Sequence, residues 1–405
     1  IDLPYITGQI AFIDTFRLYD RIDIQGAENC KIILKNSQTE ESVEHDFVID
    51  KIVSNKKANE QSDLIMIHIV DDILFSSNVK NVNKAYSGQP DEIIKKIADE
   101  WLDKTVEPLY TDIFQKKIKV IVPNMTPIDA MIWMKNRATT TDGYPTYLFS
   151  SFTMNTLIHA DLKTMIEGEP INKRAPFIYG PTAHDIEVNL QQRFVPIKEY
   201  SIEQTEDLYN LIADGLVSAN QHFLNTHTFK DKRSVFNIHE DALSGILETK
   251  NSNKIVSLAD DFEIDDVKLQ ETKARTITQI SESGAYDDGT NRLVSYAEDN
   301  TEGHKKKIIA LALKKLLTKN AITIRIDGTG FITTSGHFTT GNTVRILFSA
   351  NRPNSLGDMK LDIKKSGDYL IYGAKHSFAG ARYQIHLKCV KLTNYTDDNP
   401  LKVIG

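Results

Sequence analysis

Histidines and acidic side chains are the residues of this chain that could hold a metal ion. The densest groups among its 11 histidines are His222 with His227, and His239 beside Glu240 and Asp241. Neither group has two helical histidines four residues apart with a glutamate between them, and no cysteine pair accompanies them. The spacing predicts solvent-exposed or edge histidines and no metal site.

Paired carboxylates could bind calcium or act as a general acid and base. Three such pairs fall in one stretch of the chain: Asp260 with Asp261, Asp265 with Asp266, and Asp287 with Asp288. They lack the alternating oxygen ligands and the central glycine of a calcium-binding loop. We expect them to lie in an exposed acidic loop.

Phosphate binding and nucleophilic catalysis need other motifs. The Asp-Gly-Thr-Gly-Phe segment at 327–331 is glycine-rich, but a strand pattern follows it where a phosphate loop needs a helix. We interpret it as a turn, and Gly336 and Gly341 as further turn residues with positive φ. No Gly-x-Ser-x-Gly motif occurs, and Cys30 and Cys389 lie in apolar alternating contexts that predict buried thiols. We predict no catalytic, cofactor-binding or metal-binding residues, and no enzyme.

Composition narrows the class of protein. The chain has 405 residues, of which 40% are hydrophobic and 25% charged, so several small domains of a soluble type are expected, with no membrane insertion. A net charge of −7 argues against a dedicated nucleic-acid binder. Residues 240–299 hold 14 acidic and 6 basic side chains, which predicts a separate acidic unit. The first residue is Ile1 rather than methionine, which leaves open that a preceding piece is missing or removed.

The elements that would position any site are clearest near the C-terminal end. Apolar and polar residues alternate in three stretches within 321–392, because successive strand side chains point to opposite faces. Their apolar positions are Ile322, Ile324 and Ile326, then Val344, Ile346 and Phe348, then Tyr383, Ile385, Leu387 and Cys389. This pattern predicts an antiparallel sheet with one buried face, and helical spacing at 303–318 predicts an amphipathic helix just before it.

The first 80 residues show a looser strand pattern. Strands are expected at 9–15, 23–25, 30–35, 47–52 and 64–70, with a polar connection between the first two. Polar loops are expected at 36–44 and 53–63, where asparagine, lysine and serine are frequent. A small barrel or sandwich fits these strands.

The middle of the chain changes to helical spacing. Pro90 after Gln89 begins one predicted helix, and Thr126, three residues before Asp129, caps another. Strands are expected at 118–122, 144–152 and 194–202, and a short helix at 205–215. We therefore predict a multidomain α+β protein with two antiparallel β barrel or sandwich domains, at 1–80 and at 191–235 with 301–395. An α/β domain at 81–190 and an acidic insertion at 236–300 lie between them.

The order of these segments resembles the central baseplate hub proteins of contractile-tailed bacteriophages, the T-even trimeric type. The pieces that carry the resemblance are 8–14 with 24–28, 125–134, 142–145, 200–233, 283–286 before Arg292, 341–348 and 368–387. The family has no short motif that fixes residue roles, so the resemblance assigns segments only.

The resemblance implies a structural virion protein. Two tail-tube-like domains in each chain would let a homotrimer present six modules around a channel that meets a hexameric tail tube on one side and a threefold central spike on the other. It implies tail-tube or tube-initiator proteins, the spike and a tape-measure protein as partners, with transient DNA passage, assembly in the host cytoplasm and no membrane insertion. We expect the polar loops at 36–44 and 53–63 to contact neighbouring subunits.

Two other functions fit the residues. A hub of a contractile toxin-injection particle would have the same architecture. A monomeric carbohydrate-binding β protein would instead use Trp101, Trp133 and the aromatic residues of 144–149 to line a groove. Those aromatic residues lie mostly at helical core spacing, which weakens the second alternative.

Overall fold

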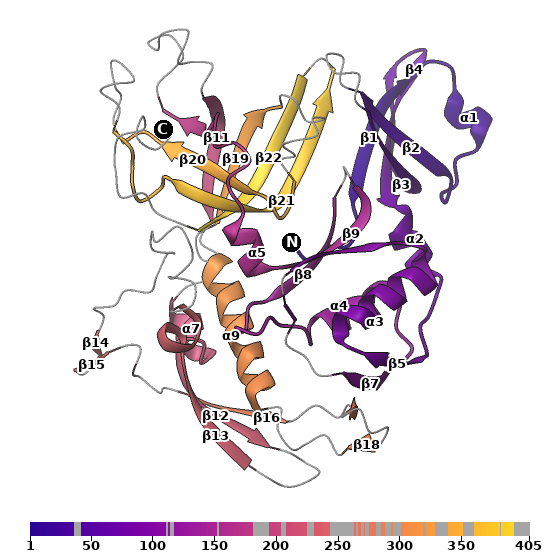
Figure 1. Ribbon diagram of the computed structural model, residues 1–405. Coiled ribbons are helices and arrows are strands. Elements are labelled where there is room, and N and C mark those ends of the chain that lie inside the picture. Colours follow the sequence, from indigo (N-terminus) through magenta and orange to yellow (C-terminus); the bar gives the residue numbers. More distant parts are fainter. Residues whose placement is uncertain are drawn as a thin grey trace.

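The computed structural model describes residues 1–35, 42–110, 112–113, 117–151, 154–180, 194–203, 208–224, 231–243, 301–318, 321–328, 339–350, 360–380 and 382–392, with short pieces between 263 and 294. Figure 1 shows a β barrel and a separate β sheet at the two upper corners, with mixed helical structure below them. The chain is therefore an α+β protein whose largest strand-rich modules come from its two ends.

The first module is an open four-stranded antiparallel sheet with strand order β1-β4-β3-β2. Its strands are β1 (Thr7–Asp14), β2 (Asn29–Lys35), β3 (Ser42–Asn59) and β4 (Ser62–Asp71). One face carries Phe47, Ile49, Ile65, Ile67 and Ile69, which are buried, because side chains alternate along each strand. We call this module the open sheet.

Two predictions for this module are wrong. Residues 53–63 are not a loop: β3 continues to Asn59 and returns as β4 from Ser62, with Lys57 opposite Asp63. Polar residues form strands here because pairing satisfies their backbone groups while both faces of the hairpin remain in water. The predicted strand 23–25 is also absent, and the short helix α1 (Leu18–Ile22) lies in the connection before it.

The middle of the chain packs helices against two small sheets. The helices are α2 (Asp72–Asn78), α3 (Pro90–Ile97), η1 (Ala98–Leu102), α4 (Pro127–Lys135) and α5 (Leu162–Glu167). One sheet joins β5 (Ala85–Gly88), β7 (Ile118–Ile121), β17 (Ala285–Asp287) and β18 (Leu293–Val294), and the other joins β6 (Val106–Leu109), β8 (Thr146–Ser151) and β9 (Met154–Asp161). The Thr126 hydroxyl accepts a hydrogen bond from the Asp129 backbone N–H, so the predicted cap is confirmed.

The second module is a closed six-stranded barrel with strand order β10-β11-β19-β22-β21-β20. Its strands are β10 (Phe177–Tyr179), β11 (Val195–Glu203), β19 (Ala321–Asp327), β20 (Thr343–Phe348), β21 (Gly367–Ala379) and β22 (Arg382–Lys391). The three alternating stretches found in the sequence are β19, β20 and β22, and they bury their apolar side chains in the barrel core. We call this module the closed barrel.

The closed barrel differs from the expected antiparallel sheet in one strand. β10 pairs in parallel with both β11 and β20, and the remaining pairs are antiparallel. β10 precedes residue 191, where the second β domain was predicted to begin, and β12 (Ser218–Leu224) and β13 (Asp231–Asn237) form a separate sheet with β16 (Thr276–Ile280). The domain boundaries themselves stay predictions.

Helix α9 (Thr301–Thr318) lies below the barrel in Figure 1. Its buried side chains Ile308, Ala312 and Leu316 belong to one core with Leu370 and Val390 of the barrel strands. The same core includes Leu211 of α7 (Leu208–Ala213) and Ala242 of η2 (His239–Leu243). The predicted helix at 303–318 is confirmed. The remaining pair is β14 (Glu263–Ile264) with β15 (Val267–Lys268).

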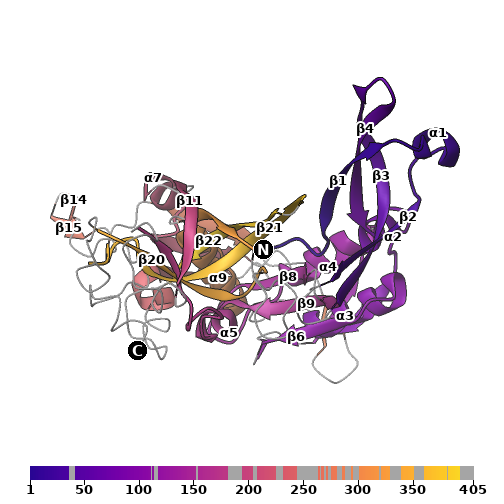
Figure 2. The same cartoon turned by 90° about the horizontal axis from the view of Figure 1, so that it is seen from above.

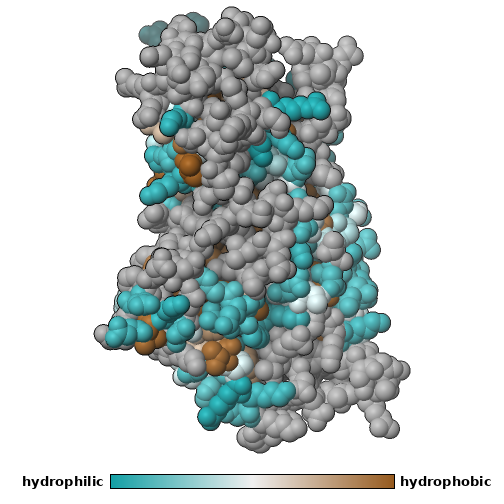
Figure 3. Space-filling model, turned by 60° about the vertical axis from the view of Figure 1, so that its left-hand side comes forward, coloured by the Kyte–Doolittle hydropathy of each residue, from teal (hydrophilic) through white to brown (hydrophobic). Residues whose placement is uncertain are grey.

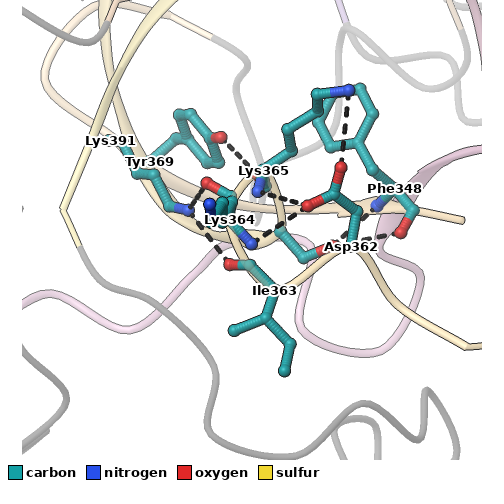
Figure 4. A network of polar contacts seen from close by, with 8 residues as sticks. Phe348, Asp362, Ile363, Lys364, Lys365, Tyr369 and Lys391 are labelled. Atoms are coloured by element: carbon teal, nitrogen blue, oxygen red, sulfur yellow. Dashed lines mark hydrogen bonds and ion pairs between the residues drawn. The ribbon is translucent and has the colours of Figure 1, made fainter. Parts of the chain in front are cut away.

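Two turns adjoin the barrel strands β20 and β21, one at each end of their pairing. Gly341 has φ of +93° and an added Cβ would lie 2.7 Å from Phe149, so only glycine fits this turn without strain. Figure 4 shows the second turn, where the Asp362 carboxylate accepts hydrogen bonds from the backbone N–H groups of Lys364 and Lys365. The Lys391 amine donates to backbone carbonyls of this turn, and burial lowers its pKa to about 8.

Candidate assembly surfaces

The open sheet has two unpaired edges. β1 and β2 are its outer strands, so the outward backbone N–H and C=O groups of both have no neighbouring strand in the described part of the chain. Edge strands of this kind can pair with another chain, and proteins usually cover or blunt them. In the closed barrel every strand has a neighbour on both sides, although β10 and β11 share only two residue pairs.

Apolar side chains are exposed next to one of these edges. Ile13 at the end of β1 is 61% exposed, and Phe16, Leu18 and Ile22 around α1 are 73%, 41% and 58% exposed. We call these four residues the α1 crest. Leu64 lies opposite Ile13 on β4 and is also exposed, so the apolar surface continues onto the sheet.

The backbone of the α1 crest is held by one buried carboxylate. Asp14 accepts hydrogen bonds from the backbone N–H groups of Phe16 and Leu18 at Oδ1 and of Tyr19 at Oδ2, over 2.9 to 3.2 Å. These bonds, that from Tyr19 first, lower the pKa of the Asp14 carboxyl. Arg17 and Asp23, which flank α1, have φ of 52° and 51°, in the left-handed region that non-glycine residues rarely adopt. The crest therefore keeps an unfavourable backbone while exposing apolar side chains.

A second apolar surface lies where β10 meets β11. Only two residue pairs join these strands, Phe177 with Val195 and Ile178 with Pro196. Beyond them, the Tyr179 and Tyr200 rings meet edge to face at 4.6 Å between centroids, and Tyr179 and Ile202 are 38% and 49% exposed. We call Tyr179, Tyr200 and Ile202 the barrel opening. Figure 3 brings the left-hand side of Figure 1 forward, and its coloured residues are mainly hydrophilic with small apolar groups among them.

A buried His45–Asp71 contact joins β3 to β4 where the open sheet meets the α/β region. His45 Nε2 of β3 lies 3.2 Å from Asp71 Oδ2, and Asp71 also accepts a hydrogen bond from the Ile73 N–H at the start of α2. Burial alone would raise the pKa of Asp71, but the hydrogen bonds, chiefly from His45, lower it. A small cavity beside this pair is also lined by Lys104 and Leu157, so side chains from both regions meet there.

The start of the chain connects the α/β region to α9. Asp2 Oδ2 lies 2.7 Å from the Lys135 amine of α4 and 3.4 Å from the Lys314 amine of α9. Lys135 is buried, which lowers its pKa, and the two lysines lower the pKa of Asp2 against the effect of burial. Leu3 accepts a hydrogen bond from the Ser150 N–H of β8. The first three residues therefore connect α4, α9 and β8.

The aromatic residues considered for sugar binding pack into two different cores. Trp101 and Trp133 pack against the core of α3 and α4, where Trp101 Nε1 donates to the Tyr86 hydroxyl at 2.9 Å. Tyr144, Tyr147 and Phe149 are buried in the core beneath α9. These residues therefore do not line a common groove, and the carbohydrate-binding alternative loses its basis.

The residues considered for metal or phosphate binding either lie far from one another or lie outside the described residues. His222 is on β12 opposite Arg233, while Asp241 of η2 forms an ion pair with Lys305 at 2.6 Å. His227, Asp260, Asp261, Asp265, Asp288, Gly330 and Gly336 lie outside the described residues. Among the residues that are described, no group of three or more histidine, cysteine, aspartate or glutamate side chains could hold a metal ion. No helix in the described ranges is long and apolar enough to cross a membrane.

Sequence reasoning missed both apolar surfaces. The connection 16–22 was interpreted as polar, although Phe16, Leu18 and Ile22 were visible in it as apolar residues without a strand period. The barrel opening could not be found, because it depends on the three-residue strand β10 ending early against β11.

Comparison with known proteins gives a fold match over 96% of the chain. No family model and no curated protein match the sequence. Among solved structures, the 43 kDa tail protein of prophage MuSo2 from Shewanella oneidensis matches 96% of this chain and 90% of its own at 10% identity, with a TM-score of 0.51.

Two further solved structures match with lower scores. A tail protein from Neisseria meningitidis matches 96% of this chain and 97% of its own at 13% identity, with a TM-score of 0.47. A component of the type VI secretion system of E. coli, described as similar to two T4 bacteriophage tail proteins, matches 98% of this chain and 74% of its own at 7% identity, with a TM-score of 0.41. This chain has the fold of the prophage MuSo2 tail protein.

Proposed function

We propose that this protein is a structural component of a phage tail, and that three copies form the baseplate hub between the tail tube and the central spike. The observation that carries the proposal is the end-to-end fold match to a prophage tail protein, which covers 96% of this chain. Fold alone does not define function, so the resemblance in segment order and the two apolar surfaces supply the remaining support.

The two β modules suit a ring of three chains. Each copy would contribute an open sheet and a closed barrel, so that six modules surround one channel. Six modules can meet a hexameric tube on one side, while the threefold axis matches a threefold spike on the other. The partners we propose are therefore tail-tube or tube-initiator proteins and the spike, with a tape-measure protein in or near the channel.

The net charge of −7 suits a channel for DNA. Phosphates bind strongly where lysine and arginine neutralise them, whereas an acidic or neutral wall lets them pass. In this proposal the protein has no catalytic role, and its location is the baseplate of the virion after assembly in the host cytoplasm.

We propose that the β3–β4 hairpin contacts neighbouring tube or hub subunits. Its outer part, residues 53–63, consists mainly of exposed polar residues, including Lys56 and Lys57. The companion segment of the same proposal, 36–44, lies outside the described residues except for 42–44 at the start of β3.

Electron cryo-microscopy of the purified chain tests the proposal. We expect ring-shaped particles with threefold symmetry and six β modules around a channel. Twofold particles, or single copies at every protein concentration, would contradict the hub. If the particle is a threefold ring but the genes next to the gene for this protein encode a toxin-injection particle, the hub architecture stands. The protein would then belong to that particle and not to a phage.

A further inference from the structure

We propose that the α1 crest of one copy packs against the barrel opening of the next copy. The proposal rests on the ring of identical chains under "Proposed function" and names the contact that closes it. Its two surfaces are Ile13, Phe16, Leu18 and Ile22 on one side, and Tyr179, Tyr200 and Ile202 on the other.

The crest has two properties of a binding surface. It gathers four exposed apolar side chains within ten residues, and Phe16 is the most exposed of them. Apolar groups gathered in this way in water mark interaction sites more often than single exposed side chains do. Arg17 lies between the Asp14 bonds to Phe16 and Leu18, and the Asp23 N–H donates to the Tyr19 carbonyl, so the structure maintains these left-handed residues at a cost in backbone energy.

The barrel opening supplies an aromatic surface for such a crest. Tyr200 is half-buried and packs edge to face on Phe348 at 5.0 Å, so the aromatic surface rests on the barrel core. Ile202 follows two residues after Tyr200 on the same face of β11 and is 49% exposed. Rigid aromatic residues flanked by aliphatic ones are typical anchors of protein interfaces.

The positions of the crest and the barrel opening indicate that the binding partner is a second copy of this chain. Figures 1 and 2 place α1 and β11 on opposite sides of the molecule in both views. A ring of identical subunits needs two different patches on opposite flanks of each chain, because every contact joins one patch to the other. The crest and the opening lie on the two β modules that would alternate around such a ring.

Charged residues of both signs surround each patch and offer opposite-charge pairs between them. Arg17 and Arg21 are exposed on the crest side, and Glu203 is exposed beside Ile202. Asp20 on α1 could likewise meet Lys198 of β11, which also pairs with Asp327 within its own chain. Complementary rims of this kind favour one register of contact over others.

Single substitutions test each side of the contact. Phe16→Asp and Ile202→Asp each place a charge in the interface, and both side chains are exposed in the single chain, so folding should be retained. We expect at least about thirtyfold weaker association for each, seen as loss of the trimer in light scattering. Val79→Asp is the matched control, because Val79 is 69% exposed outside both patches and should leave the trimer intact.

A mixture of the two variants tests the pairing directly. A Phe16→Asp copy keeps an intact barrel opening, and an Ile202→Asp copy keeps an intact crest. Equal amounts should therefore form a complex of two chains, one of each kind, although neither variant associates alone. Absence of that complex would overturn the pairing of crest with opening.

The wild-type result separates this inference from the proposed function. If the wild-type chain is trimeric and Phe16→Asp stays trimeric, the contact is wrong and the hub stands. If the wild-type chain is monomeric at every concentration, both the contact and the trimeric hub are overturned. Circular dichroism and the melting temperature confirm in each case that the variants are folded.

Discussion

The open sheet and the closed barrel bury their apolar faces in different ways. In the barrel, six strands close around a core in which Ile324, Ile346 and Ile385 have no exposed surface. In the open sheet, Ile10 and Ile32 on the apolar face of the edge strands are only partly buried. A closed barrel is complete within one chain, whereas an open sheet with unpaired edges gains most from a neighbour. The comparison suggests that the barrel is the stable part and the open sheet the part completed by assembly.

The largest expected difference between the modules concerns their cores. Ile385→Ala should destabilise the barrel by about 2 to 5 kcal/mol, because it leaves a cavity among fully buried side chains. The matched change Ile32→Ala should cost only about 1 kcal/mol, since that side chain is half buried on an edge strand. Hydrogen exchange of peptides from each module measures both effects. Equal losses would mean that the open sheet is already as complete as the barrel.

Acid should also affect the barrel through a partly buried histidine. Burial lowers the pKa of His376 on β21 to about 4, and its Nδ1 lies 2.9 Å from the Tyr383 hydroxyl. As the pH falls, His376 is protonated in the unfolded chain before it is protonated in the folded barrel. The stability that neutral His376 contributes is therefore fully present above about pH 6.5 and is lost as the pH falls toward 4. The loss should amount to about 2 kcal/mol, allowing for the partial exposure of the ring.

His376→Gln tests the origin of that pH dependence. Glutamine can keep a hydrogen bond to Tyr383 and does not titrate, so barrel exchange rates should depend less on pH between 6.5 and 4. His386 on β22, whose pKa burial also lowers, leaves a smaller dependence in the variant. An unchanged pH profile would show that His376 is accessible to protons in the folded barrel.

The turn around Asp362 should contribute less to the stability of the barrel. Lys391→Met keeps the buried stem of the side chain but removes the hydrogen bonds from its amine to the carbonyls of Ile363 and Lys364. We expect a loss of about 1 kcal/mol, measured by denaturant unfolding of the barrel. In the wild-type protein the pKa of Lys391 is lowered to about 8, so stability should rise as the pH increases above 8. Methionine does not titrate, so the variant should lack this rise. A loss of stability equal to that of Ile385→Ala would contradict this ranking.

The smallest global effect is expected at the crest. Asp14→Ala removes the acceptor for Phe16, Leu18 and Tyr19 and should speed exchange of their amides without changing the stability of the barrel. Asn at the same position keeps one acceptor and should restore part of the protection. A variant that loosens the barrel as well would show that the two modules are energetically coupled.

Much of this fold could be predicted from local patterns. The alternation in β19, β20 and β22, the helix α9, and the helix starts at Gln89 and Thr126 follow from spacing and capping within a few residues. The closure of the barrel through β10 could not be predicted, because a three-residue strand has no period and its pairing depends on distant strands.

The candidate surfaces depend on exposure, which the sequence does not show. Phe16 and Ile202 are ordinary apolar residues in the sequence, and only the ends of α1 and β10 leave them in water. The polar hairpin 53–63 was missed for the opposite reason, since composition suggested a loop where pairing with β4 makes strands. Composition indicated the class of protein, and tertiary pairing determined where its free surfaces lie.

The mass of the purified chain in solution tests the central claim most directly. Light scattering over a range of concentrations should give a species of three times 45.8 kDa. A single species of 45.8 kDa at every concentration would contradict the account in which the open sheet and the closed barrel of neighbouring copies complete one ring.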